Sequence, residues 1–168
     1  SFYAVDVWSE PHIVNWVWFN SPVEFCYCPH TQRRFREWPE PKYGAIENHN
    51  RAWYRTFSDW EQAEAPRYGT ILSYTDFIDW KTFVALKLRE DLKLKADASA
   101  SRAGRPVSSH SDAPAVMLSP LSGFGSPDDW WMSHSVDYYG TSIYPKHAAA
   151  ATPWSAVRLT SALDGIRS

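Results

Sequence analysis

The feature that most constrains the fold of this sequence is an alternation of short β-type runs with helical segments. The clearest helix is predicted from about Thr75 to Ala98, where apolar side chains recur every three or four residues between charged ones, and Gly104 is predicted to mark its end. β-type runs lie on either side of it, at residues 5–8, 105–110 and 136–145. Strands separated by helices favour a parallel sheet with helical crossovers, so the sequence predicts an α/β fold.

Shorter helices are expected in the remaining segments. One begins near His30 and is expected to end before Pro39 and Pro41, because a proline inside a helix removes a backbone donor. A serine followed by a proline at Ser126 and Pro127 predicts another helix start. Two further helices are predicted over residues 46–57 and 153–166, and residues 11–29 are expected to form a long loop.

Composition narrows the class of protein. The chain has 168 residues, of which 44% are hydrophobic and 21% charged, as in a single globular domain over residues 1–168. A net charge of −2 gives no electrostatic reason to expect nucleic acid, and no apolar run is long enough to cross a bilayer. We therefore expect neither nucleic acid nor a membrane as partner. The cellular location stays open, with the cytoplasm favoured over secretion.

Aromatic residues are unusually abundant, with 10 Trp, 9 Tyr and 8 Phe. Some of them must form the core, which is the commonest use of large rings. Others fall in segments rich in Ser, Pro and Gly, where flat rings beside polar groups suit the faces of sugars. Trp16, Trp18, Trp130 and Trp131 are best placed for stacking, although helix neighbours point apart and at most one of the last two faces a ligand.

Glu10 follows the first β-type run directly, and Pro11 and His12 come next. A carboxylate at the carboxyl end of a buried strand occupies the position where barrel enzymes keep their catalytic acids. The alternative is a solvated glutamate that merely ends a strand. Both interpretations fit the residues alone.

A set of sequence blocks then runs through most of the chain in a characteristic order and spacing. After the strand that ends in Glu10 come residues 25–30 (FCYCPH), 35–38 (FREW), 42–44 (KYG), 50–53 (NRAW), 105–107 (RPV) and 143–145 (IYP). From Trp8 to about Pro145, this set resembles the catalytic barrel of β-galactosidases in family 42 of the glycoside hydrolases. The resemblance implies a partial TIM (β/α)8 barrel, roughly strands 4 to 6 with their helices, without strands 1–3 and 7–8.

The resemblance makes Glu10 the general acid/base of a retaining glycosidase, which needs a pKa raised by partial burial beside Trp8 and Pro11. The family usually has asparagine before this glutamate, in contact with the sugar 2-hydroxyl, whereas this chain has Ser9. The nucleophile of the family belongs to strand seven and would lie beyond Ser168. We therefore expect the chain alone to be inactive.

Other substrate contacts are implied less directly. Tyr144 matches a tyrosine on the active-site face of the family, where it lines the sugar pocket, or it is half-packed at a strand end. His110 ends the second β-type run and contacts substrate hydroxyls, or it is simply hydrogen-bonded. His12, Trp16, Trp18 and Trp131 complete the expected substrate-binding set. Three carboxylates within the chain are poor candidates for the nucleophile. Asp128 and Asp129 are better explained as charges at a helix start, and Asp137 begins its strand and is expected to point away from the active-site face.

Cys26 and Cys28 are separated by one residue and make a poor disulfide pair, so free thiols are expected. They match the first two cysteines of a Cys-x-Cys-x-x-Cys zinc motif in many family members, but the third position is Thr31. Even with His30 as a third ligand, a closed tetrahedral site is incomplete. We expect no structural zinc and no other cofactor.

The leading hypothesis is therefore a fragment of a retaining hydrolase of terminal β-galactosides that acts by a two-carboxylate double displacement. A non-catalytic carbohydrate-binding or scaffolding protein derived from the same barrel is the second hypothesis. A related retaining hydrolase, such as a β-mannosidase or a glucosidase, is the third, because Ser9 replaces the usual asparagine. Whether a full-length parent forms a homo-oligomer stays open.

Overall fold

The computed structural model describes residues 3–11, 14–15, 23–24, 26–67, 74–111 and 128–142, together with Thr160 and Asp164. These residues form an α/β structure, as predicted. Its strands are β1 (Val5–Ser9), β2 (Val14–Asn15), β3 (Val23–Glu24), β4 (Val107–Ser111) and β5 (Tyr138–Thr141). Its helices are α1 (Pro29–Glu37), α2 (Pro39–Tyr43), α3 (Ile46–Trp53), the 3₁₀ turn η1 (Trp60–Gln62), α4 (Thr75–Ala103) and α5 (Asp129–Ser133). In the described part of the chain, no helix is long and apolar enough to span a membrane.

The main sheet has the strand order β1–β4–β5, and both pairs of neighbours are parallel. Parallel neighbours need a crossover, and here α4 lies between β1 and β4 in the chain while α5 lies between β4 and β5. The predicted alternation of strands and helices is thus confirmed. The expected loop over residues 11–29 is wrong in one respect, because β2 and β3 within it form a small antiparallel pair.

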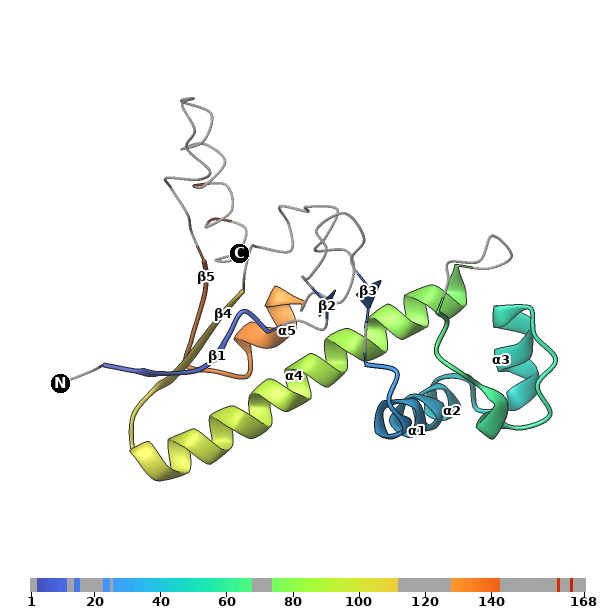
Figure 1. The fold of residues 1–168 in the computed structure, drawn as a ribbon, viewed down its shortest axis with the longest axis horizontal. Coiled ribbons are helices and arrows are strands. Elements are labelled where there is room, and N and C mark those ends of the chain that lie inside the picture. Colours follow the sequence, from blue (N-terminus) through green and yellow to red (C-terminus); the bar gives the residue numbers. More distant parts are fainter. Residues whose placement is uncertain are drawn as a thin grey trace.

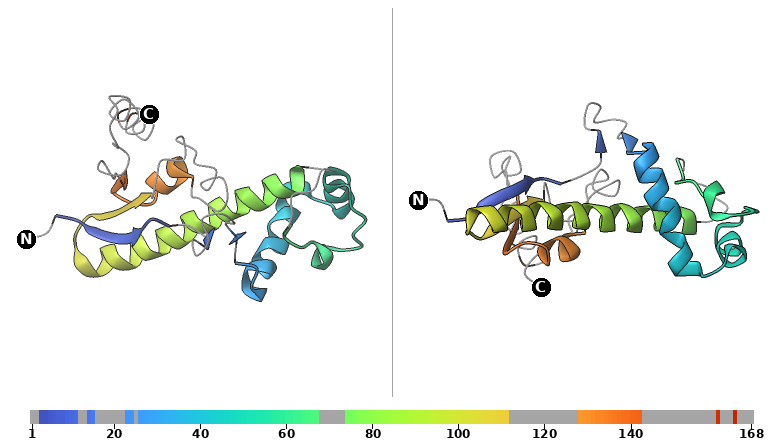
Figure 2. Two further views of the ribbon diagram at one scale, coloured as in Figure 1. Left: turned by 45° about the horizontal axis from the view of Figure 1, so that its top comes forward. Right: turned by 90° about the horizontal axis from the view of Figure 1, so that it is seen from below.

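Helix α4 runs most of the length of the molecule (Figure 1). The three parallel strands lie along its C-terminal half, and α1, α2 and α3 lie around its N-terminal half (Figures 1 and 2). It extends five residues beyond the predicted Ala98 and ends at Gly104, whose φ of 56° is left-handed. Glycine adopts that conformation without steric cost, which is why it ends helices so often.

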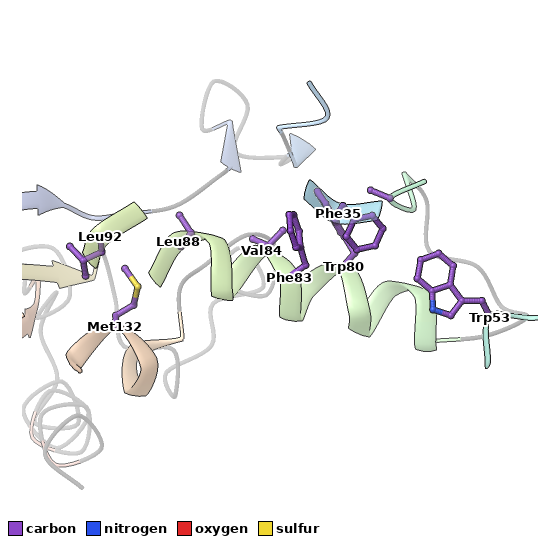
Figure 3. Close-up of a cluster of buried hydrophobic side chains, with 9 residues drawn as sticks. Phe35, Trp53, Trp80, Phe83, Val84, Leu88, Leu92 and Met132 are labelled. Atoms are coloured by element: carbon purple, nitrogen blue, oxygen red, sulfur yellow. The ribbon is translucent and has the colours of Figure 1, made fainter. Parts of the chain in front are cut away.

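The core follows α4 from Trp80 to Leu92 (Figure 3). At the helical end, the ring of Phe35 packs edge-on against Trp80 and Phe83, each with centroids 5.2 Å away. At the sheet end, Leu88 and Leu92 are fully buried, and Met132 of α5 joins them in the same apolar cluster. Some of the abundant aromatic residues therefore form the core, as predicted.

Two boundaries in the helices before α4 differ from the prediction. Pro39 ends α1 but also begins α2, because proline at the first helical position gives up only a donor that has no partner there. Helix α3 stops at Trp53 rather than Phe57, because Tyr54 adopts a left-handed conformation with φ 53°.

Helix α5 also begins differently from the prediction. Its N-cap is Asp128, whose Oδ1 accepts a hydrogen bond from the backbone N–H of Trp131 at 2.9 Å. Ser126 and Pro127, the expected cap and first residue, lie outside the described residues, as does the last predicted helix except for Thr160 and Asp164.

Candidate active site

The carboxyl ends of the three parallel strands lie at one edge of the sheet. The register pairs Ser9 with His110 and His110 with Gly140, while Ser111 pairs with Thr141. The residues that follow the strands, Glu10 and Ser142, therefore emerge at the same edge. Strand-end side chains of parallel sheets meet here because every strand points the same way.

Glu10 is held at this edge by its backbone and by its carboxylate. Its N–H donates to the carbonyl oxygen of His110 at 2.9 Å, and its φ of 50° turns the chain sharply at the strand end. A non-glycine residue in this region costs about 1–2 kcal/mol, and such strain is concentrated at functional sites. Pro11 follows and is fully buried, so the turn is anchored on its far side.

The Glu10 carboxylate reaches across the sheet. Its Oε1 accepts a hydrogen bond from Oγ of Ser142 at 2.5 Å, and Ser142 follows β5, two strands away from β1. Two strand spacings amount to about 10 Å, so the half-buried carboxylate lies over the end of the central strand β4. Ser142 is itself fixed by its N–H, which donates to the carbonyl oxygen of Ser111 at 2.7 Å.

A second polar group lies beside Glu10, on β1 and β4. Nδ1 of His110 is 2.8 Å from Oδ2 of Asp6, and Nε2 of His110 is 3.2 Å from Oγ of Ser9. A carboxylate only accepts hydrogen bonds, so the network assigns the proton to Nδ1 and leaves the Nε2 lone pair for the Ser9 hydroxyl. The three side chains thus form one directed chain of hydrogen bonds, which we name the Asp6–His110–Ser9 relay.

An irregularity in β1 places Asp6 and Ser9 on the same side of the strand as His110. The register shifts between Asp6 and Trp8, as in a β-bulge. Both Val7 and Trp8 then pack against the helical core, while Asp6 and Ser9 are exposed. Strict alternation would place Asp6 and Trp8 on one face, so the bulge separates the polar group from the core.

The other predicted site residues are distributed as follows. His12, Trp16, Trp18 and Tyr144 lie outside the described residues. Trp131 is half-buried on α5, and the hydrogen bond described for it is made by its backbone. Its neighbour Trp130 is 61% exposed and packs its ring against His134. The structure therefore brings together Glu10, Ser9 and His110 of the predicted set.

The alternative carboxylates lie where the sequence analysis expected them. Asp128 caps α5, and Asp129 accepts a hydrogen bond from the hydroxyl of Tyr139 at 2.7 Å. Asp137 accepts from the N–H of Val107 at 2.9 Å, at the amino end of β4 and opposite the edge that carries Glu10.

The two cysteines are free and half-buried, as expected. Cys28 caps α1, and its sulfur lies 3.4 Å from Oγ1 of Thr31. A hydrogen bond with Cys26, helped by Thr31, lowers the pKa of the Cys28 thiol to about 6. Among the described residues, no group of three potential metal ligands comes together.

Two residues of this edge were missed by the sequence analysis, Asp6 and Ser142. Ser142 stands just after β5 as Glu10 stands just after β1. It was missed because the third strand was predicted to run to residue 145, whereas β5 ends at Thr141. Asp6 depends on the bulge and left no comparable signal, because alternation alone places it on the side of Trp8.

Comparisons with known proteins show which family the chain is similar to. The β-galactosidase model of glycoside hydrolase family 42 matches residues 7–167. The β-galactosidase BglY of Alicyclobacillus acidocaldarius is 35% identical over 81 residues, which cover 45% of this chain and 12% of that protein. The β-galactosidase BgaP of Planococcus sp. strain L4 is 24% identical over 163 residues, which cover 90% of this chain and 22% of that protein.

A solved structure shows the same fold. The β-galactosidase from Bacillus circulans sp. alkalophilus superposes with a TM-score of 0.65 at 23% identity, over 86% of this chain and 21% of that one. The chain thus spans between about an eighth and a fifth of the length of these relatives. Since the family model covers nearly all of it, the chain belongs to glycoside hydrolase family 42.

Proposed function

We propose that this chain is the part of a retaining β-galactosidase that carries the general acid/base, and that Glu10 is this group. In this proposal β1, β4 and β5 are roughly strands 4 to 6 of a (β/α)8 barrel, and α4 and α5 belong to its outer layer. The parallel order β1–β4–β5, with a helix before each later strand, supports that assignment. The printed names of the relatives support β-galactosides as substrates.

The observation that carries the proposal is the environment of the Glu10 carboxyl group. It is half-buried over the carboxyl edge of the sheet and shares a hydrogen bond with the Ser142 hydroxyl. A hydroxyl can donate to a carboxylate and can equally accept from a carboxylic acid. Ser142 is therefore suited to hold a group that alternates between the two protonation states during each turnover.

The reaction then proceeds in two balanced steps. In the first, Glu10 gives its proton to the glycosidic oxygen while a second carboxylate attacks the anomeric carbon and the alcohol leaves. In the second, Glu10 takes a proton from water, which displaces the carboxylate and releases the sugar. Glu10 ends the cycle protonated, as it began.

Retaining chemistry needs the second carboxyl group about 5–5.5 Å from the first. Among the described residues, Asp6 is engaged with His110, and Asp137 lies at the opposite edge of the sheet. We therefore propose that the nucleophile comes from a flanking segment of the parent protein, and that the isolated chain does not turn over glycosides.

The experiment is a substrate comparison on the parent protein that contains this chain. Alkyl β-galactoside, β-mannoside and β-glucoside are offered to the natural protein and to Glu10→Gln. We expect the galactoside to be hydrolysed fastest and the variant to lose at least about 100-fold, a typical contribution of a general acid. If the mannoside or the glucoside were hydrolysed fastest, the proposed substrate would change, but the proposed role of Glu10 would stand.

A second candidate is a non-catalytic carbohydrate-binding protein built on the same barrel. Ser9 favours it, because its short hydroxyl is already bonded to His110 and leaves less capacity for a sugar than an amide would. This candidate predicts that galactose binds equally well to the natural protein and to Glu10→Gln, with no hydrolysis by either. That pair of results would refute the enzymatic proposal.

A further inference from the structure

The Asp6–His110–Ser9 relay has the geometry of an activated serine nucleophile. Such a serine needs a base within about 2.6–3.2 Å, and the base needs a third group that fixes its orientation and tautomer. Ser9 Oγ lies 3.2 Å from Nε2 of His110, and Nδ1 of His110 lies 2.8 Å from Oδ2 of Asp6. The three side chains thus stand in the order that this chemistry requires.

We propose that Ser9 is a nucleophile that accepts acyl groups from small activated carboxylic esters, with His110 as general base and Asp6 as its positioning residue. This activity is separate from glycoside hydrolysis and does not depend on it. It uses neither the Glu10 carboxylate nor a nucleophile outside the chain.

The backbone preorganises the relay. Ser9 and His110 are paired directly in the register of β1 and β4, so their side chains start from neighbouring positions. The carbonyl oxygen of His110 is held by the N–H of Glu10 at 2.9 Å. On the other side, Oδ1 of Asp6 accepts from the backbone N–H of Trp8 at 3.3 Å, which leaves Oδ2 for the imidazole.

The relay is also reachable. The side chain of Asp6 is 43% exposed and that of His110 is 28% exposed, and Ser9 is exposed as well. The described contacts place no pair of backbone donors beside Ser9 to stabilise an oxyanion. The expected substrates are therefore esters with good leaving groups, such as aryl acetates, which need little help at that stage.

The chemistry balances without any further reactant. Ser9 Oγ bonds to the carbonyl carbon, and its proton passes to Nε2 of His110. The alcohol then leaves with that proton, so an acyl-serine and a neutral imidazole remain. Water, the second substrate, gives a proton to Nε2 of His110 and attacks the acyl carbon. The bond to Ser9 Oγ then breaks, His110 returns the proton to that oxygen, and the carboxylic acid is released.

The chain provides a matched control in Ser133 and His134. Oγ of Ser133 lies 3.4 Å from Nδ1 of His134, but the same Nδ1 is 2.6 Å from the carbonyl oxygen of Trp130. A carbonyl only accepts, so this nitrogen carries its proton and cannot take another from serine. Ser133 is therefore a half-buried serine beside a histidine, and that histidine offers it no available base.

The test labels the purified chain with a fluorophosphonate probe and locates the label by peptide mass spectrometry. We expect one label per chain, on Ser9, with release of 4-nitrophenol from 4-nitrophenyl acetate. Ser9→Ala should abolish both, and His110→Gln should slow labelling about 100-fold. Asp6→Asn should slow it at least about 10-fold through the wrong tautomer, and Ser133→Ala should leave it unchanged.

Two results would overturn the inference. One is labelling at Ser9 that proceeds at the same rate in His110→Gln, since the base would then be irrelevant. The other is absence of label on Ser9 while far-ultraviolet circular dichroism shows the chain folded. Neither result touches the glycosidase proposal, which is tested on sugars through Glu10.

Discussion

At the scale of single residues, Asp79 shows how the helical end is held together. It is fully buried on α4 and accepts hydrogen bonds from the Tyr43 hydroxyl at 2.6 Å and the Trp53 indole N–H at 2.9 Å. Lys42 adds an ion pair from α2. Burial, together with the bond to Asp79, raises the pKa of Tyr43 above its usual range.

Asp79→Ala should lower the free energy of unfolding by about 3 kcal/mol, because it leaves buried donors without an acceptor. Urea unfolding followed by tryptophan fluorescence measures the loss. Asp97→Ala is the control, because Asp97 makes a similar ion pair with Lys93 on the exposed side of the same helix. The control should cost at most about 0.5 kcal/mol, and equal losses in the two variants would contradict the role of Asp79.

His49 is the second informative residue. It is fully buried among the rings of Tyr43, Trp53, Phe57 and Trp60. Within the described structure, neither ring nitrogen has a hydrogen-bond partner. Burial lowers the pKa of His49 from its ordinary 6.5, and the charge of Asp79 only partly opposes this shift.

The lowered pKa of His49 makes the stability of the fold depend on pH. The folded chain keeps His49 neutral while the unfolded chain binds a proton more readily, so stability is present above pH 6.5 and is lost as pH falls below it. Thermal unfolding between pH 7.5 and 5 should show this loss, and His49→Phe should show less of it. An identical pH dependence in the variant would remove His49 as the cause.

At the scale of elements, α4 was the most predictable part of the fold, because its apolar stripe and Gly104 are both local signals. The helices before it were less predictable. Their ends depend on Pro39 starting a new helix and on Tyr54 accepting a left-handed backbone, and neither follows from residue type alone.

Leu88→Ala tests the role of α4 as the central support. Leu88 is fully buried between the two ends of the core, so its truncation should cost about 3 kcal/mol through lost burial and a residual cavity. Leu94→Ala on the same helix is the control, because Leu94 is 71% exposed. Urea unfolding of both variants is the measurement. A cost below about 1 kcal/mol for Leu88→Ala would show that α4 is not tightly packed there.

The candidate site was predictable only in part, for a similar reason. Glu10 and His110 could be predicted because each stands at the end of a β-type run in the sequence. Ser142 became visible through the register across two strand pairs, and Asp6 through a bulge in β1. These are long-range properties that no local pattern encodes. The sugar-stacking role of Trp16 and Trp18 and the pocket-lining role of Tyr144 stay predictions.

At the scale of the whole molecule, the described sheet is covered on one face by α4 and α5 (Figure 2). Parallel sheets are normally covered on both faces. Among the described residues, the rings of Tyr3 and Tyr138 are exposed, and their hydroxyls are hydrogen-bonded at 2.9 Å.

The purified chain should therefore fail to hydrolyse 4-nitrophenyl β-galactoside, because the proposed nucleophile belongs to a flanking segment. Release of 4-nitrophenol at millimolar substrate is the measurement, and the parent protein under the same conditions is the control. Turnover by the chain that disappears in Glu10→Gln would show that both carboxylates lie within it.

The central claim is that Glu10 is the proton donor and acceptor of a retaining glycosidase, and leaving-group dependence tests it most directly. In the parent protein, Glu10→Ala is assayed on an alkyl β-galactoside and on 2,4-dinitrophenyl β-galactoside, with and without azide. The account predicts a loss of at least about 100-fold on the alkyl substrate, whose leaving group needs a proton. It also predicts a much smaller loss of kcat/KM on the dinitrophenyl substrate, and azide rescue that yields β-galactosyl azide. Equal losses on both substrates without azide rescue, or no loss on either, would contradict it.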